Sequence, residues 1–76
     1  MTTAEVATRI ELALPGAKVE VEDYTGTGDH FRAVVEASQF SGHSLVAQHQ
    51  MVYSALKEPM ATEAIHALSL STRAPE

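Results

Sequence analysis

The hydrophobic pattern of the chain is centred on one long predicted helix, residues 43–57. Its apolar residues recur with the 3.6-residue period of an amphipathic helix. His49 stands within this stripe, where we expect a partly buried, hydrogen-bonded ring; a pH-sensitive or metal-linked role is the alternative. We expect the helix to support a sheet. The apolar positions are Leu45, Val46, Val52, Tyr53 and Leu56.

A first helix is predicted near the N-terminus. Thr2 is a suitable N-cap, and Glu5 stands three residues later, which is the spacing of a capping box. Pro15-Gly16 ends the helix. The apolar positions between these signals follow helical spacing and are Val6, Ile10, Ala13 and Leu14.

Three segments show the alternating pattern of half-buried strands. Residues 17–22 and 31–37 are separated by a connector, 23–29, that is rich in turn-forming residues. Because the connector is short, the two strands should form an antiparallel hairpin. Residues 66–72 alternate again and form the third predicted strand.

The segment between the second and third strands carries clear boundary signals. Phe40 is predicted to fill the edge of the core, and Ser41 or Ser44 caps the long helix. Glu58-Pro59 breaks that helix, and Pro59 suits the first turn of a short helix that continues to about Ile65.

These elements predict a single α+β domain over residues 1–76, in the order α-β-β-α-α-β. It is a two-layer domain, a three-stranded sheet with helices on one face. The order matches the type II KH arrangement, a nucleic-acid-binding fold. KH domains that grip RNA use a Gly-x-x-Gly loop between adjacent helices. Residues 57–60 occupy that place and contain no glycine.

Composition narrows the classes of function. The formal charge is −5, and the five basic residues are scattered, which disfavours non-specific binding to nucleic acid. The N-terminus lacks a secretory signal, and no apolar run could span a bilayer, so we expect no membrane association and a cytoplasmic location. No catalytic motif is present, and a domain this small offers little room for a ligand pocket, so we expect a protein that is not an enzyme.

Two histidines carry most of the candidate chemistry. His30 closes the Gly-rich loop where the second predicted strand starts, and His66 stands where the short helix meets the third strand. If these strands are neighbours, both imidazoles approach one edge and could ligate a borderline metal or an iron–sulfur cluster. The alternative is that both are structural or incidental. Gly26-Thr27-Gly28 is better explained by a turn than by a phosphate-binding loop, because no helix follows it.

Several short segments, in order along nearly the whole chain, resemble the BolA family. They are Asp29-His30-Phe31, Val34-Val35, Phe40-Ser41-Gly42, His49-Gln50-Met51-Val52-Tyr53, Ile65-His66-Ala67-Leu68 and Thr72-Arg73-Ala74-Pro75-Glu76. The resemblance implies the α-β-β-α-α-β fold and a non-enzymatic protein. Its members pair with monothiol glutaredoxins, and the pair can hold a bridging [2Fe-2S] cluster.

The resemblance also implies a set of ligands. Glutaredoxin cysteine and glutathione supply sulfur, and the family histidine of the Ile-His-Ala-Leu segment maps onto His66. A second ligand, His or Cys, comes from the loop between the first two strands. Thr27 stands near the loop cysteine of some members and cannot replace it, whereas His30 matches the common His-Phe step. The chain has no cysteine, so its cluster would borrow sulfur from the partner.

Two functions follow as expectations. The first is iron–sulfur trafficking or iron and redox regulation together with a monothiol glutaredoxin. The alternative is a DNA-binding transcriptional regulator that uses the two adjacent helices. Many relatives carry Arg-His-Arg in the long helix where this chain has Gln48-His49-Gln50, so phosphate contacts would be lost there. The sequence leaves open whether the protein forms a homodimer.

Overall fold

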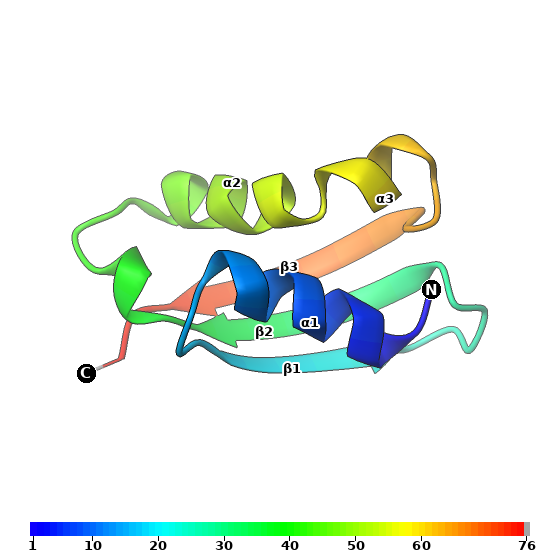
Figure 1. Cartoon of the computed structure of the whole chain (residues 1–76), viewed down its shortest axis with the longest axis horizontal. Helices are drawn as coiled ribbons and strands as arrows, with labels where there is room; N and C mark the ends of the chain where they lie inside the picture. The colour runs from blue at the N-terminus through cyan, green and yellow to red at the C-terminus, as the bar shows by residue number, and fades with distance from the viewer. Residues whose placement is uncertain (76) are drawn as a thin grey trace.

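The computed structural model describes residues 1–75, and its elements follow the predicted order with one short 3-10 helix added. Two layers are formed, a twisted sheet and the helices that cover one of its faces (Figure 1). In chain order the elements are α1 (Thr3–Ala13), β1 (Lys18–Asp23), β2 (His30–Glu36), the 3-10 helix (Ser38–Phe40), α2 (Leu45–Ala55), α3 (Lys57–Ala61) and β3 (Ala67–Arg73). The predicted α+β architecture is therefore confirmed.

The sheet has the strand order β1-β2-β3, so β2 lies in its centre. β1 and β2 are antiparallel, which confirms the predicted hairpin, and Val19 lies opposite Val35. β2 and β3 are parallel, with Ala33 opposite Leu70. A parallel pair needs a crossover connection, and α2 with α3 provides it. As a consequence, β2 and β3 begin at the same end of the sheet.

The core lies between the helices and the covered face of the sheet. β2 contributes every second residue to it, as expected for a strand with one face buried. The apolar face of α1 and the C-terminal half of α2 complete the layer. The buried hydrophobic residues of this core are Val6, Ile10, Leu14, Phe31, Ala33, Val35, Ala37, Phe40, Val52, Leu56 and Ile65.

The helix starts follow the predicted caps. Thr2 and Glu5 form a reciprocal capping box, in which each side chain accepts the other's backbone N–H at 3.1 Å. Of the two candidates for α2, Ser44 is the N-cap, and its hydroxyl accepts the N–H of Ala47 at 3.2 Å. Within residues 1–75, no helix is long and apolar enough to cross a membrane.

The predicted apolar stripe of α2 is only partly buried. Val52 and Leu56 have no exposed surface, but Leu45, Val46 and Tyr53 are 60%, 67% and 39% exposed. Val46 and Tyr53 are seven residues apart and share one flank, which lies about 100° around the helix from Val52. The period therefore identified the helix correctly, whereas the prediction that these three residues pack against the sheet is wrong.

The helical segment after α2 differs from its predicted bounds. α3 begins at Lys57, two residues before Pro59, which costs nothing because the first N–H groups of a helix have no partner within it. It ends at Ala61 rather than near Ile65. Glu63 adopts a left-handed conformation with φ of 63°, and the N–H of Ile65 folds back to the Pro59 carbonyl at 3.0 Å. This reversal ends the helix.

His49 lies half-buried on α2, as predicted. Its Nε2 atom is buried and has no hydrogen-bond partner within residues 1–75. The prediction of a hydrogen-bonded ring is therefore wrong for this nitrogen. The neighbouring Gln48 forms a hydrogen bond to the sheet, in which its side-chain oxygen accepts the Thr72 hydroxyl at 2.8 Å.

Candidate metal centre

The two candidate ligands lie at the end of the sheet where β2 and β3 begin, which we call the histidine end. His30 is the first residue of β2, and His66 immediately precedes β3. The parallel register places His30 opposite Ala67, so the two histidines are brought side by side. Figure 1 shows the β1–β2 loop, the turn that enters β3 and the N-terminus at this same end.

The imidazole rings of His30 and His66, the histidine pair, are close enough to act together. Their centroids are 5.2 Å apart, and the ring planes are tilted by 45°. The side chain of His30 is 30% exposed, and His66 is exposed. Two neutral imidazoles with open access can ligate a borderline metal or an iron of a cluster. The expectation that both histidines approach one edge is confirmed.

Asp29 is in direct contact with this pair. Its Oδ1 atom lies 2.7 Å from Nδ1 of His30 and also accepts the hydroxyl of Thr27. The Thr27 hydrogen bond, and then the one from His30, hold the pKa of Asp29 below its ordinary value. A carboxylate in this setting is ionised at neutral pH and can only accept hydrogen bonds.

Two further side chains, Tyr24 and Arg32, lie on one side of His30. The ring of Tyr24 meets His30 edge-on, with centroids 6.3 Å apart and an angle of 85° between the planes. The guanidinium of Arg32 covers the Tyr24 ring at 4.9 Å from its centroid, which is a cation–π geometry. One side of the His30 ring therefore packs against the Tyr24 ring.

The loop that carries Asp29 is shaped by its own hydrogen bonds. The carboxylate of Asp23 accepts the N–H groups of Gly26 and Gly28 at 3.0 and 2.9 Å. Both glycines have positive φ, 74° and 75°, a conformation that glycine adopts without strain. The N-terminal ammonium of Met1 donates to the Gly28 carbonyl at 3.1 Å. The glycines serve the turn, as the sequence predicted.

The donor set of the histidine end fits a shared metal centre. It offers two imidazoles and a carboxylate already bound to one of them, and the chain contains no cysteine. Within residues 1–75, no group of three or more His, Cys, Asp or Glu side chains is arranged to hold a metal ion. Thiolate ligands, which an iron–sulfur cluster requires, would therefore come from another molecule.

The remaining histidines lie elsewhere. His43 is exposed and precedes α2, whose first turn lies at the end of the molecule opposite to the histidine end (Figure 1). His49 lies half-buried within α2. The structure therefore separates the four histidines into one pair with shared chemistry and two that stand apart.

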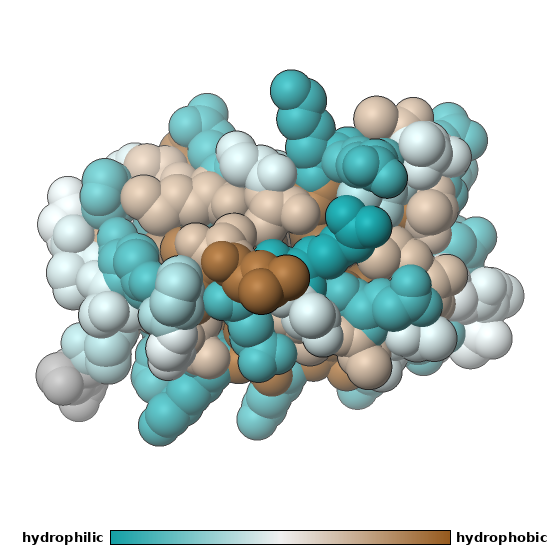
Figure 2. Space-filling model, in the orientation of Figure 1, coloured by the Kyte–Doolittle hydropathy of each residue, from teal (hydrophilic) through white to brown (hydrophobic). Residues whose placement is uncertain are grey.

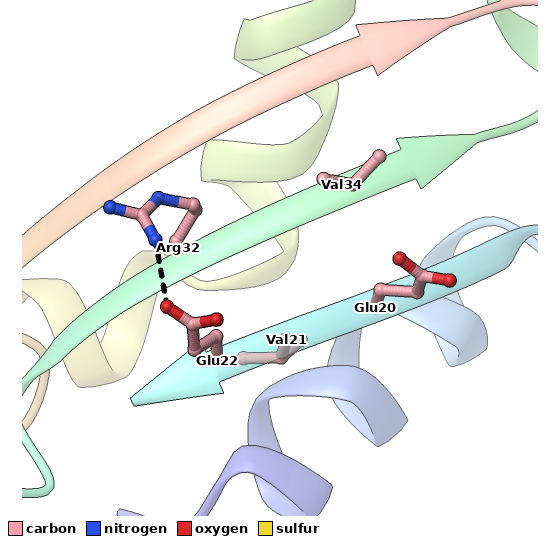
Figure 3. Close-up of a pocket in the computed structure, with 5 residues that line it drawn as sticks. All are labelled: Glu20, Val21, Glu22, Arg32 and Val34. Atoms are coloured by element: carbon pink, nitrogen blue, oxygen red, sulfur yellow. Dashed lines mark hydrogen bonds and ion pairs between the residues drawn. The ribbon is translucent and has the colours of Figure 1, made fainter. Parts of the chain in front are cut away.

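The uncovered face of the sheet carries charges in pairs. Figure 3 shows the ion pair between Glu22 and Arg32, 2.7 Å apart, beside Glu20 and Val34, with the helices behind the sheet. Both Lys18 and Arg73 contact Glu36, at 3.8 and 3.1 Å. These are exposed pairs, which contribute little to stability.

The helical layer also exposes an apolar side chain of α1, in addition to those of α2 described above. Figure 2 shows a brown patch over α1, bordered by teal, hydrophilic side chains and by paler, mildly hydrophobic ones. Leu12 of α1 is 77% exposed. A single exposed leucine of this kind is ordinary on a soluble domain and indicates no binding site by itself.

Two residues of the site had no predicted role. Asp29 stands directly before His30, and a carboxylate next to a candidate metal-ligating histidine is a usable signal. Tyr24 is six residues before His30, and only the fold of the loop brings their rings together. The sequence carries no comparable signal for this second contact.

Comparisons with known proteins agree on one family. The family model described as BolA-like protein matches residues 7–76. A solved bolA homologue from Coxiella burnetii is 39% identical, with a TM-score of 0.81 over 99% of this chain and 92% of that one. BolA-like protein 1 of Bos taurus is 33% identical over 79 residues, which cover 95% of this chain.

A further relative has a regulatory name. The DNA-binding transcriptional regulator BolA of Escherichia coli is 38% identical over 47 residues, or 62% of this chain. The matched regions are 58% of the bovine protein and 44% of the E. coli one, so both relatives extend beyond the shared part. The fold, the family model and these identities agree: the chain belongs to the BolA-like protein family.

Proposed function

We propose that this chain is a non-enzymatic partner of a monothiol glutaredoxin, with which it shares a bridging [2Fe-2S] cluster. Its role would lie in iron–sulfur trafficking or in iron and redox regulation. The observation that carries this proposal is the histidine pair, whose ring centroids are 5.2 Å apart at an accessible end of the sheet. Membership of the BolA-like family supports it, since the family resemblance implies this partner.

In this proposal the two molecules supply different ligands. His66 is the first ligand of this chain and His30 the second candidate, while the glutaredoxin cysteine and glutathione supply sulfur. A cluster of this kind contains iron and can accept or donate one electron. The chain itself orients the two imidazoles and packs Tyr24 against His30.

The test is reconstitution with a cluster-loaded monothiol glutaredoxin and glutathione, followed by visible absorbance and circular dichroism. The mixture is expected to show a spectrum that differs from that of the glutaredoxin alone. His66→Ala should abolish this difference, and His30→Ala should weaken or alter it. His43→Ala is the matched control, because His43 is also exposed but lies at the other end. If His66→Ala leaves the spectrum and cluster lifetime unchanged, the ligand assignment is wrong.

A second candidate is the DNA-binding regulator, which the similarity to the E. coli protein of that name favours. The chain's charge argues against it. Of its five basic residues, Lys18, Arg32 and Arg73 face carboxylates within ion-pair distance. A gel shift across a salt series decides the matter, because binding through phosphates weakens steeply as salt rises. Absence of a shift at low salt would end this candidate.

A further inference from the structure

We propose that Asp29 is the positioning residue of the histidine pair, acting on His30 through its carboxylate and on His66 through its backbone carbonyl. The carboxylate lies 2.7 Å from Nδ1 of His30. The carbonyl oxygen accepts the N–H of His66 at 2.7 Å and that of Ala67 at 3.2 Å. One residue therefore contacts both members of the pair. The part of the inference that concerns a metal rests on the proposed function.

The carboxylate contact selects one tautomer of His30. An ionised carboxylate has no proton to donate, so Nδ1 of His30 must carry the hydrogen of this bond. Nε2 then keeps its lone pair and is the nitrogen that can ligate. In water, neutral histidine favours the opposite tautomer, with the proton on Nε2. Asp29 thus prepares the ring for ligation, as carboxylates do for metal-bound histidines elsewhere.

The carbonyl contact fixes the position of the backbone at His66. The reversal after α3 brings the chain back towards the sheet at Ile65, and the next two N–H groups both meet the Asp29 carbonyl. This bond joins the last residue before β2 to the residue before β3. The spacing of the two rings therefore depends on the placement of Asp29.

The loop holds Asp29 in turn. The Thr27 hydroxyl donates to the same oxygen that faces His30 and is itself 2.6 Å from the Thr25 hydroxyl. The Asp23 carboxylate accepts hydrogen bonds from the backbone N–H groups of Gly26 and Gly28. A prepared second layer of this kind restricts the rotamers of the carboxylate, which is the condition for orienting a ligand.

The first experiment uses the metal-free protein, labelled with nitrogen-15, above the pKa of histidine, at about pH 8.5. The chemical shifts of the two ring nitrogens report which one is protonated. In the wild type, His30 is expected to carry its proton on Nδ1. In Asp29→Ala, which removes the side chain but keeps the carbonyl, the proton should move to Nε2. A wild-type ring protonated on Nε2, or an unchanged tautomer in Asp29→Ala, would overturn the proposal.

Two further variants separate position from charge. Asp29→Asn keeps an oxygen that can accept from Nδ1, so the wild-type tautomer should be partly restored. Glu20→Gln removes the same charge from an exposed position of β1 and should leave the tautomer of His30 unchanged. If Glu20→Gln shifts the tautomer as much as Asp29→Ala, the effect is one of net charge and the positioning role is refuted.

The second experiment measures cluster retention in the complex with monothiol glutaredoxin. Loss of an outer partner of a metal-bound histidine lowers metal affinity about 10–100-fold, so Asp29→Ala should shorten cluster retention on that scale. Glu20→Gln should retain the cluster as the wild type does. Equal retention in Asp29→Ala and the wild type would refute the role towards the metal. If the wild-type complex holds no cluster, the proposed function fails, whereas the tautomer measurement still decides the role of Asp29.

Discussion

The apolar layer and the histidine end are held together by different interactions. The apolar layer consists of buried side chains that come from α1, α2, the 3-10 helix and the sheet. Among the described residues, no polar side chain of the histidine end is fully buried. Its structure depends instead on hydrogen bonds made by the β1–β2 loop, Asp29 and the N-terminus. Stability should therefore reside in the first region and chemistry in the second.

The largest expected effect is that of Phe40→Ala in the apolar layer. Phe40 is fully buried, and loss of a buried phenylalanine costs about 3–5 kcal/mol. A domain of this size has a free energy of unfolding of about 4–11 kcal/mol, so much of it would be lost. Urea unfolding measures the change. A loss below about 1 kcal/mol would show that the 3-10 helix is not part of the cooperative core.

Next in size is Gly28→Ala, which tests the loop of the histidine end. A residue with a side chain at this positive φ costs about 1–2 kcal/mol. The added Cβ atom would also lie 3.3 Å from the Met1 carbonyl oxygen. Gly26→Ala is the matched control, since its φ is nearly equal but its Cβ would meet open space. Thermal unfolding should show a larger loss for Gly28→Ala; equal losses would mean that the N-terminus does not hold the loop.

A smaller effect is expected from Thr2→Ala, which removes the N-cap of α1. Such a substitution costs about 1 kcal/mol. Thr8→Ala, at an exposed position inside the same helix, should instead be neutral or slightly stabilising because alanine has the higher helix propensity. Denaturant unfolding of both variants measures the difference. If both variants change the free energy of unfolding in the same direction, the capping box is not formed in solution.

The smallest effect on stability is expected from His66→Ala. His66 is exposed, and exposed substitutions usually change the free energy of unfolding by less than about 0.5 kcal/mol. The same variant should remove the cluster-dependent spectrum of the glutaredoxin complex. A stability loss above about 1.5 kcal/mol would instead mark His66 as a structural residue and blur the division between the two regions.

Periodicity and boundary signals were sufficient for the fold. The capping box at Thr2 and the alternation of residues 17–22 each identified an element correctly. The break predicted at Glu58-Pro59 is instead at Leu56, and Pro59 lies inside α3. These signals could not tell which flank of α2 is buried. Val46 and Val52 have the same hydrophobicity, and only the position of the sheet decides that one is exposed and the other is not.

The candidate site was predictable to the level of its two histidines. Adjacent strands were expected to bring His30 and His66 to one edge, and the parallel register does so. The position of Asp29 before His30 was a usable signal. Its hydrogen bond to Nδ1 of His30 and the missing partner of His49 Nε2 could not be predicted, because both depend on differences in distance of a few tenths of an ångström. Hydrogen bonds between side chains are decided at that scale, whereas strand pairing is decided by hydrophobic pattern.

The parallel pairing of β2 and β3 has a consequence for how the protein is used. His30 and His66 are 36 positions apart in the sequence, so the pair exists only after the crossover has folded. A cluster that needs both rings binds native molecules alone and stabilises them by mass action, by about 2.7 kcal/mol at a hundredfold excess over the dissociation constant. Under the proposed function, a glutaredoxin would thereby deliver its cluster only to folded copies and protect them from unfolding.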